Sequence, residues 1–397
     1  MADHGRKLIP LEGLRGIAAA IVVLYHLVLA FTPKGVGAVP HGYGALDLFT
    51  QFILGMLNGG AAVAVFFVLS GFILSLPFAR DRRASRVLVA LLKRWPRLAC
   101  LTVIACLFAF LLISWSGHDY KAAAHVIGAQ WLATHGNAPI KPEHLTWEEA
   151  LREGLVNVFT RGEVKFDSPL WTMRIELFGS FAIFLAAPVL FAIGSWAVRL
   201  GLVALVVYMS GTGYPFTYLA DFLAGTVLAM LHAEGRLPRL GNKAACALGL
   251  LGLYLFSFTY EQALLIHAPL KLFLSATYCH YVWDAGAVLM IIVLLGNPAA
   301  SRAFSGRWAA WLGLLSFPIY LLHGPILLSA GSVAFMDGVG TLGMAGAALA
   351  AAAFSILLTL LCAVPLAWVD QLWTRLLSRL TRPFTGRRPP VGMELAR

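Results

Sequence analysis

The sequence predicts an all-α polytopic membrane protein, a helical bundle with about ten transmembrane helices and with both the N- and C-termini cytoplasmic. Of its 397 residues, 59% are hydrophobic and only 12% are charged. The mean hydropathy of +0.79 lies outside the range of soluble globular domains. Apolar runs long enough to cross the roughly 30 Å of hydrocarbon as helix recur along the whole chain.

Breaks at charges and at Gly/Pro clusters divide the apolar sequence into predicted spans. In chain order, these lie at residues 10–31, 60–78, 98–116, 172–193, 196–211, 216–232, 244–259, 282–297, 310–330 and 343–370. Most of the 30 Lys and Arg residues fall in alternate loops. Because cytoplasmic loops retain positive charge, this bias supports ten spans with both ends inside.

The first span follows Arg6 and Lys7, which resembles the start of a signal peptide. Its apolar run is long and no Ala-x-Ala site ends it, so we expect it to stay in the mature protein. The second and third spans flank the basic stretch 80–97, which the same charge rule places in the cytoplasm.

Residues 117–170, between the third and fourth spans, form a predicted external loop. The stretch "TWEEALREGLVNVF" in this loop begins with Thr146, a good N-cap, and Glu149 three residues on completes a capping box. We expect an amphipathic helix at the membrane interface there. Short loops join the later spans, except for a predicted external or re-entrant piece at 260–281.

Two units follow from these assignments. Residues 1–370 form one transmembrane domain, and residues 371–397 form a basic, Pro-rich cytoplasmic tail. The formal charge of +11 is accounted for by basic loops facing an anionic inner leaflet, so it requires no nucleic acid partner. The five cysteines show no disulfide framework and no metal-ligand spacing.

The first span contains ionisable residues in the stretch "LEGLRGIAAAIVVLYHL". Arg15 and His26 are eleven residues apart, within about 20° of three full helical turns, so they share one face and lie roughly 16 Å apart along it. Taken singly, Arg15 is also explained as a snorkelling helix-end cation and His26 as an interhelical hydrogen-bonding group. Together they predict a polar pathway through the bundle.

The two residue types fit a definite chemistry. A guanidinium is suited to phosphate, and a histidine is suited to taking a proton from an alcohol near neutral pH. Arg15 at the cytosolic mouth and His26 deeper in the bilayer therefore fit an extended donor with a phosphate head, such as an acyl-CoA. Its thioester would be delivered toward the far side of the membrane.

At these residues the sequence resembles the acyltransferase-3 family of integral membrane O-acyltransferases. The stretch "LRGIAAAIVVLYH" reproduces the family's R-x10-H pattern. Further blocks match in order: "FFVLSGFIL" at 66–74, "KRWPR" at 93–97, "SPLWTMRIELF" at 168–178 and "LGLLSFPIYLLHGPI" at 312–326. The resemblance covers nearly the whole bundle, and the ordered set of blocks is specific.

The resemblance implies transfer of an acyl group, usually acetyl, from cytosolic acyl-CoA to a hydroxyl of an extracytoplasmic glycan or glycolipid. It also implies a multi-pass location in a bacterial-type inner (cytoplasmic) membrane, with acyl-CoA as co-substrate and with no bound cofactor and no metal. His26 matches the family's catalytic histidine, and Arg15 matches the arginine of the same motif.

Other motif residues receive roles alongside a simpler interpretation. Arg94 and Arg97 lie one turn apart and are either donor-phosphate ligands or an ordinary positive-inside cluster at the start of the third span. Glu176 either orients His26 from the fourth span or pairs with Arg174 at headgroup level.

Tyr320 and His323 lie one turn apart in the ninth span. They either line the acceptor path or hold helices together through polar contacts. For Ser70, within "VLSGF", we assign no chemistry beyond close helix packing.

Two other functions remain open at this point. One is a membrane transporter of an acyl donor or small anion that uses the same polar pathway. The other is a noncatalytic partner of a polysaccharide export complex. The sequence does not identify the acceptor or the length of the acyl chain.

Overall fold

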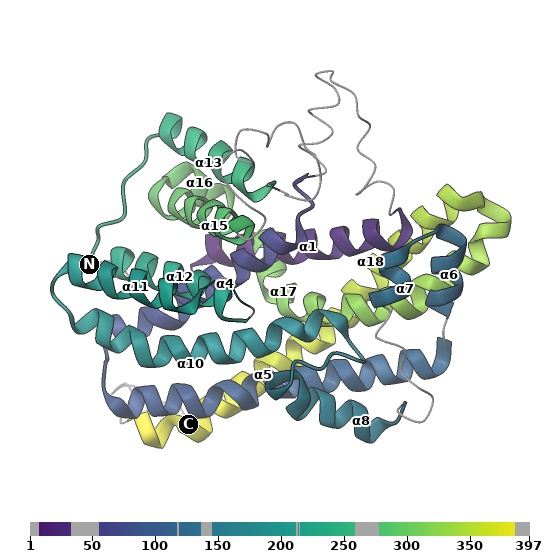
Figure 1. Ribbon diagram of the computed structural model, residues 1–397, viewed down its shortest axis with the longest axis horizontal. Helices are drawn as coiled ribbons and strands as arrows, with labels where there is room; N and C mark the ends of the chain where they lie inside the picture. The colour runs from purple at the N-terminus through teal and green to yellow at the C-terminus, as the bar shows by residue number, and fades with distance from the viewer. Residues whose placement is uncertain are drawn as a thin grey trace, which may run out of the picture.

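The computed structural model describes residues 8–32, 55–116, 119–135, 145–211, 213, 215–258 and 278–385, and every secondary-structure element among them is helical. The turn region at 136–144, most of the predicted piece at 260–281 and the tail from residue 386 onward lie outside the described residues. Figure 1 shows long helices running side by side along the longest axis of the molecule, with α13, α15 and α16 grouped at one end.

The helices follow the chain in this order: α1 (Ile9–Phe31), α4 (Gly59–Ser75), η1 (Leu76–Ala79), α5 (Ala84–Ser116), α6 (Asp119–Ile127), α7 (Gln130–His135), α8 (Trp147–Arg152), η3 (Glu153–Asn157), α9 (Val158–Thr160), η4 (Ser168–Leu170), α10 (Trp171–Ala192), α11 (Trp196–Ser210), η5 (Phe216–Tyr218), α12 (Leu219–Ala233), α13 (Asn242–Phe256), α15 (Cys279–Gly296), α16 (Pro298–Ala303), α17 (Arg307–Ile326), η8 (Leu327–Gly331), α18 (Ser332–Thr381) and η9 (Arg382–Thr385).

A helix covers most of each of the ten predicted spans, so the chain is a polytopic, all-helical membrane bundle. By length and composition, seven helical stretches among the described residues are candidates to cross a membrane. The last of these, Arg307–Phe384, contains both the ninth and the tenth predicted spans. Helices α11 and α13 are apolar but shorter.

Two predicted boundaries differ from the structure. The third span was expected to begin at 98 because of the charges before it, yet α5 begins at Ala84 and carries Arg94 in its interior. The bundle supplies partners for this arginine, so its charge does not end the helix. Helix α18 likewise continues past 370 to Thr381, where the Trp373 indole N–H donates to the Pro96 carbonyl at 2.8 Å.

Local signals in the sequence explain several helix ends. The Thr146 hydroxyl accepts the Glu149 backbone N–H at 3.2 Å, which confirms the predicted cap and the helix that follows it. Asn58 caps α4 in the same way and also donates to the carbonyls of Phe256 and Phe258, which ties α4 to the end of α13. Gly343 has a φ of 67° and interrupts α18 where the tenth span was predicted to begin.

Helices α1 and α17 pack closely in parallel, and this pairing positions the site. A Cβ on Gly313 would lie 2.6 Å from the Glu12 Cβ, and a Cβ on Gly16 would lie 2.5 Å from the Leu312 Cβ. Only glycine permits this approach, because any side chain would force the helices apart. The result is that side chains of α1 reach the backbone of α17.

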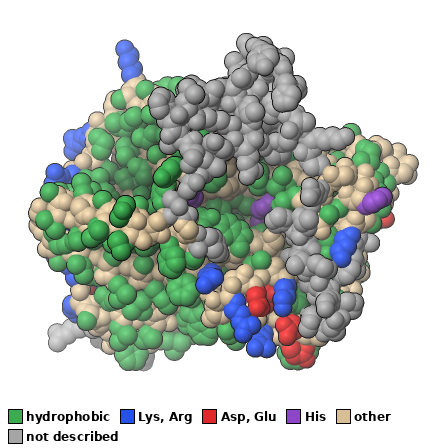
Figure 2. Space-filling view, viewed as in Figure 1, with side chains coloured by type: hydrophobic (Ala, Val, Ile, Leu, Met, Phe, Trp, Pro, Cys, Tyr) green, Lys and Arg blue, Asp and Glu red, His purple; other side chains and the backbone are tan. Residues whose placement is uncertain are grey.

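The surface agrees with a lipid-embedded bundle. Figure 2 shows apolar side chains over much of one face, with acidic and basic side chains gathered near α8. Large apolar residues such as Leu111, Leu185 and Leu361 are exposed by 60% or more. Such surfaces are unfavourable in water and are expected where helices meet hydrocarbon.

Candidate functional site

A cavity of about 190 Å³ lies inside the bundle among α1, α4, α5, α10, α17 and α18. Three arginines line it, Arg15, Arg94 and Arg97, together with two carboxylates, Glu176 and Asp370. The remaining lining is mainly apolar, with hydroxyl groups from four residues: Ser70, Thr172, Ser316 and Tyr320. The sequence-predicted donor-binding residues therefore share one cavity.

Arg94 and Glu176, which both line the cavity, form a buried ion pair. Their side chains are only 10% and 13% exposed. The Arg94 Nε–H also donates to the Ser180 hydroxyl at 2.8 Å, and the Ser70 hydroxyl donates to Glu176 Oε1 at 2.8 Å. Charges removed from water require such pairing, so each of these groups holds the others in place.

Arg15 is held by α17. Its Nε–H donates to the Ser316 hydroxyl at 2.9 Å, one Nη donates to the Gly313 carbonyl at 2.6 Å, and the same nitrogen lies 2.6 Å from a Glu12 carboxylate oxygen. Arg97 is more exposed and lies 3.9 Å from Asp370.

Each cavity arginine thus has one carboxylate neighbour. The six groups balance in charge, so the cavity is not a simple basic pocket. A guanidinium presents five N–H donors, however, and can bind an anion while it keeps a carboxylate partner. The longest of the three pairs, that of Arg97, leaves its guanidinium the most accessible to a ligand.

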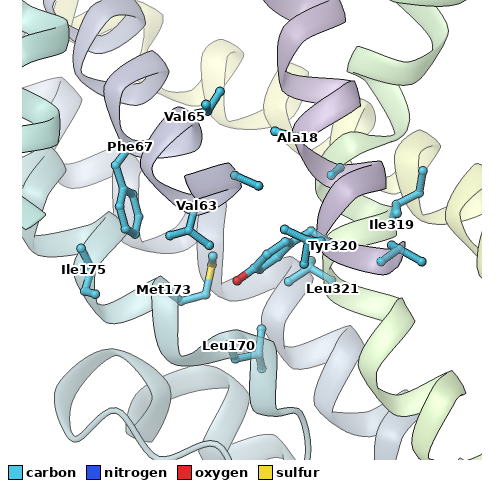
Figure 3. Packing of buried hydrophobic residues seen from close by; sticks show 14 of the residues in the cluster. Ala18, Val63, Val65, Phe67, Leu170, Met173, Ile175, Ile319, Tyr320 and Leu321 are labelled. Atoms are coloured by element: carbon cyan, nitrogen blue, oxygen red, sulfur yellow. The ribbon is translucent and has the colours of Figure 1, made fainter. Parts of the chain in front are cut away.

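Tyr320 forms the wall of the cavity on the side toward His323. Its hydroxyl donates to the Pro169 carbonyl at 2.8 Å and lies 3.0 Å from the Thr172 hydroxyl. Figure 3 shows this side chain reaching from α17 toward Met173 and Leu170. The centroid of its ring lies 5.9 Å from that of His323.

His26 meets His323 on the far side of this tyrosine. Nδ1 of His26 and Nε2 of His323 are 2.9 Å apart, and the two rings meet edge to edge, with the centroids 5.1 Å apart and the planes inclined by 19°. The ring of Trp131 of α7 lies nearly parallel to that of His26, with the centroids 5.2 Å apart. Neither histidine lines the cavity itself. Arg15 therefore contacts α17 at Gly313 and Ser316, and His26 contacts it at His323. Tyr320 lies between these two places along the helix.

The hydrogen bonds of His323 fix the tautomers of this pair. Nδ1 of His323 lies 2.8 Å from the Tyr320 carbonyl, which can only accept, so this nitrogen carries a proton. Because His323 is 2% exposed, the neutral ring is favoured, and its Nε2 then accepts. His26 must donate through Nδ1, which leaves Nε2 as its basic nitrogen.

Two residues, Glu176 and His26, have different neighbours in the structure from those that the sequence predicted. Glu176 was proposed to orient His26, but its carboxylate contacts Arg94 and Ser70, and His323 is the histidine's hydrogen-bonding neighbour. Glu176 also does not pair with Arg174, the alternative considered from the sequence.

Several groups at the site had no predicted role from the sequence. Asp370 and Trp131 carried no motif signal. Ser70 and Ser316 lie inside recognised blocks, but Ser70 received only a packing role and Ser316 received none. Outside the cavity, the described residues also contain one cluster of potential metal ligands, made by Asp221, His280 and Asp284.

Comparison with known proteins gives consistent matches. The model of the acyltransferase-3 family, described as an acyltransferase domain, matches residues 9–368. The O-acetyltransferase PaAT-1 of Phomopsis amygdali is 24% identical over 81% of this chain and 72% of its own length. The acyltransferase R4 of a Phoma species is 24% identical over 84% and 85% of the two chains. The acyltransferase clz18 of Cochliobolus lunatus is 23% identical over 81% and 83%. No solved structure matches the chain.

Proposed function

The chain belongs to the acyltransferase-3 family and is a multi-pass membrane acyltransferase, and from this premise we propose that it transfers an acyl group, in the first instance acetyl, from cytosolic acyl-CoA to an acceptor hydroxyl. The observation that carries the proposal is the arrangement along α17, with three arginines on one cavity and a tautomerically fixed His26 beyond it.

The proposed binding of the acyl donor is supported by the guanidinium groups. Arg15, Arg94 and Arg97 converge on a cavity whose other walls are largely apolar, which suits a phosphate-bearing group attached to a less polar chain. Arg97 makes the first contact with phosphate because it is the most exposed of the three. The thioester then passes Tyr320, whose ring must turn away for the acyl carbon to reach His26.

In the chemical step His26 acts as the general base. Its Nε2 takes the proton of the acceptor hydroxyl, the hydroxyl oxygen forms an ester bond with the acyl carbon, and the bond from that carbon to sulfur breaks. The CoA thiolate leaves and receives the proton from His26. His323 accepts the Nδ1–H of His26 throughout and so stabilises the imidazolium that forms.

We further propose ten membrane crossings with both termini in the cytoplasm, which follows from the helices at the ten predicted spans together with the charge bias of the loops. This topology places His26 and Trp131 toward the extracytoplasmic side, where a glycan or glycolipid acceptor would approach. A bacterial-type inner membrane stays a prediction, since the matched relatives come from fungi.

The family match favours an enzyme over the transporter and the noncatalytic partner considered above. The test compares cells that express the wild-type chain, His26→Ala and His26→Gln, with acyl groups on extracted glycans and lipids measured by mass spectrometry. Loss of general-base catalysis costs about 10²- to 10⁴-fold in rate. His232→Gln serves as the control, because this histidine packs on Phe72 away from the site. Acylation by His26→Ala at a rate close to wild type would contradict the proposal.

A further inference from the structure

A second cluster of ionisable side chains lies where α12 meets α15. Asp221 is in the first turn of α12, and His280 and Asp284 are one helical turn apart near the start of α15. Nε2 of His280 lies 2.6 Å from Asp221 Oδ1 and 3.9 Å from Asp284 Oδ1. One potential ligand atom from each of the three residues lies within 4.8 Å of the other two.

The carboxylates of this cluster are buried without sufficient partners. The side chains of Asp221 and Asp284 are 0% and 9% exposed. Both oxygens of Asp284 and Oδ2 of Asp221 are inaccessible to solvent, and no group among the described residues donates a hydrogen bond to them when both acids are ionised. Among the residues that the structure describes, no lysine or arginine pairs with any of the three. Two buried acids beside one imidazole therefore have a deficit of positive charge.

We infer that Asp221, His280 and Asp284 bind a divalent metal ion of the zinc type. Imidazole nitrogen and carboxylate oxygen both bind zinc, and a site with three protein ligands leaves the fourth tetrahedral position to a further ligand. Ligand atoms around such an ion are about 3.4 Å apart, so the observed separations need adjustments on the order of 1 Å. The ion would bind one oxygen of each acid and neutralise the two acids together.

The site is separate from the acyl-transfer cavity, since none of its three ligands lines that cavity. It joins two helices whose ligands are 59 residues apart in sequence. The ring of Tyr218 packs edge-on against His280, with the centroids 4.6 Å apart, and closes one side of the cluster. The ion would therefore link α12 to α15 at a place outside the acyl-transfer cavity.

The ligand spacing gave no sequence signal, which is why the sequence predicted no metal. His280 and Asp284 are four residues apart and share one side of α15, but the third ligand comes from another helix. The competing explanation is a proton shared between the two carboxylates. That arrangement requires no ion and predicts that no metal affects the stability of the fold.

The experiment uses the full-length, tag-free chain in detergent, stripped with a chelator and dialysed against ZnCl2, with MnCl2 and MgCl2 in parallel. Bound metal is counted by mass spectrometry of the elements, and thermal unfolding is followed on the same samples. We expect about one zinc per chain and a Tm that rises with zinc. Asp284→Asn loses both effects, and Asp284→His, which restores a ligand, regains them.

Asp81→Asn is the matched control, because this acid pairs with Arg83 on the surface and should leave zinc binding unchanged. Absence of zinc from the wild-type chain, or equal zinc in wild type and Asp284→Asn, would overturn the inference. If Asp284→Asn does not fold, the inference is tested by the number of zinc ions bound per wild-type chain and by zinc binding to Asp284→His. A wild-type chain whose Tm is indifferent to all three metals supports the shared proton instead.

Discussion

Replacing His323 tests the proposed role of the histidine pair most directly. In His323→Leu the side chain keeps a similar volume but loses the nitrogen that lies 2.9 Å from Nδ1 of His26. The partly buried N–H of His26 is then left without this acceptor, which costs up to about 1–3 kcal/mol. If the whole cost falls on the transition state, where His26 carries a full positive charge, kcat decreases about 5- to 150-fold.

The assay follows release of free CoA thiol from acetyl-CoA in membranes that carry each variant, with total acyl transfer to extracted lipids and glycans measured in parallel. His323→Gln restores a carbonyl acceptor at nearly the same position, so its kcat should recover part of the loss. The KM for acetyl-CoA should change little in either variant, because His323 does not line the cavity.

This pattern separates positioning from a purely structural effect. A His323→Leu variant with wild-type kcat would show that His26 does not need the acceptor. Equal losses in the Leu and Gln variants would attribute the effect to packing, since His323 is almost fully buried. Either result refutes the tautomer reasoning.

Three further changes test other parts of the structure. Arg97→Gln should raise the KM for acetyl-CoA several-fold with little change in kcat if Arg97 binds donor phosphate, and an unchanged KM at low salt would exclude that role. Gly71→Ala should lower stability by about 1–3 kcal/mol, because its Cβ would meet the Phe222 backbone; Gly249→Ala, where a Cβ meets nothing within 4 Å, is the control in the same thermal-unfolding measurement. Glu153 lies outside the candidate spans, and burial raises its pKa to about 7. Because this pKa is higher in the folded state than the usual 4.5, folding favours the protonated carboxyl group. The contribution of this group to the free energy of unfolding is therefore fully present below about pH 4.5 and is lost as pH rises through 7. Unfolding of Glu153→Gln measured across this range should show a flatter pH dependence, and an unchanged slope would contradict the assignment.

The pairing of every cavity arginine with a carboxylate has a consequence for donor binding. A bare basic pocket would attract any anion, whereas these guanidiniums attract only an anion that competes for or shares their N–H groups. Asp370 and Arg97 are the pair most open to such exchange. Asp370 of α18 therefore lines the cavity, although the sequence suggested that the membrane domain ended at this residue.

The sequence by itself determined the helices, the order of the spans and the family. In hydrocarbon every backbone N–H and C=O must be satisfied within its own helix, so an apolar run of sufficient length specifies a span locally. The placement of Arg15 and His26 on one face is local in the same sense, because it depends only on the helical repeat. The ordered motif blocks are also local features, and they identified the acyltransferase-3 family before any fold was known.

Only the tertiary structure decided which side chains meet. His323, which hydrogen-bonds to His26, lies 297 residues away in the sequence, Glu176 faces Arg94 and Ser70, and Asp221 lies beside His280 and Asp284 of another helix. These contacts depend on the rotation and crossing of each helix, which small residues such as Gly16 and Gly313 set through close packing. A hydropathy pattern is the same for every rotation of an apolar helix, so it contains no information about these pairings.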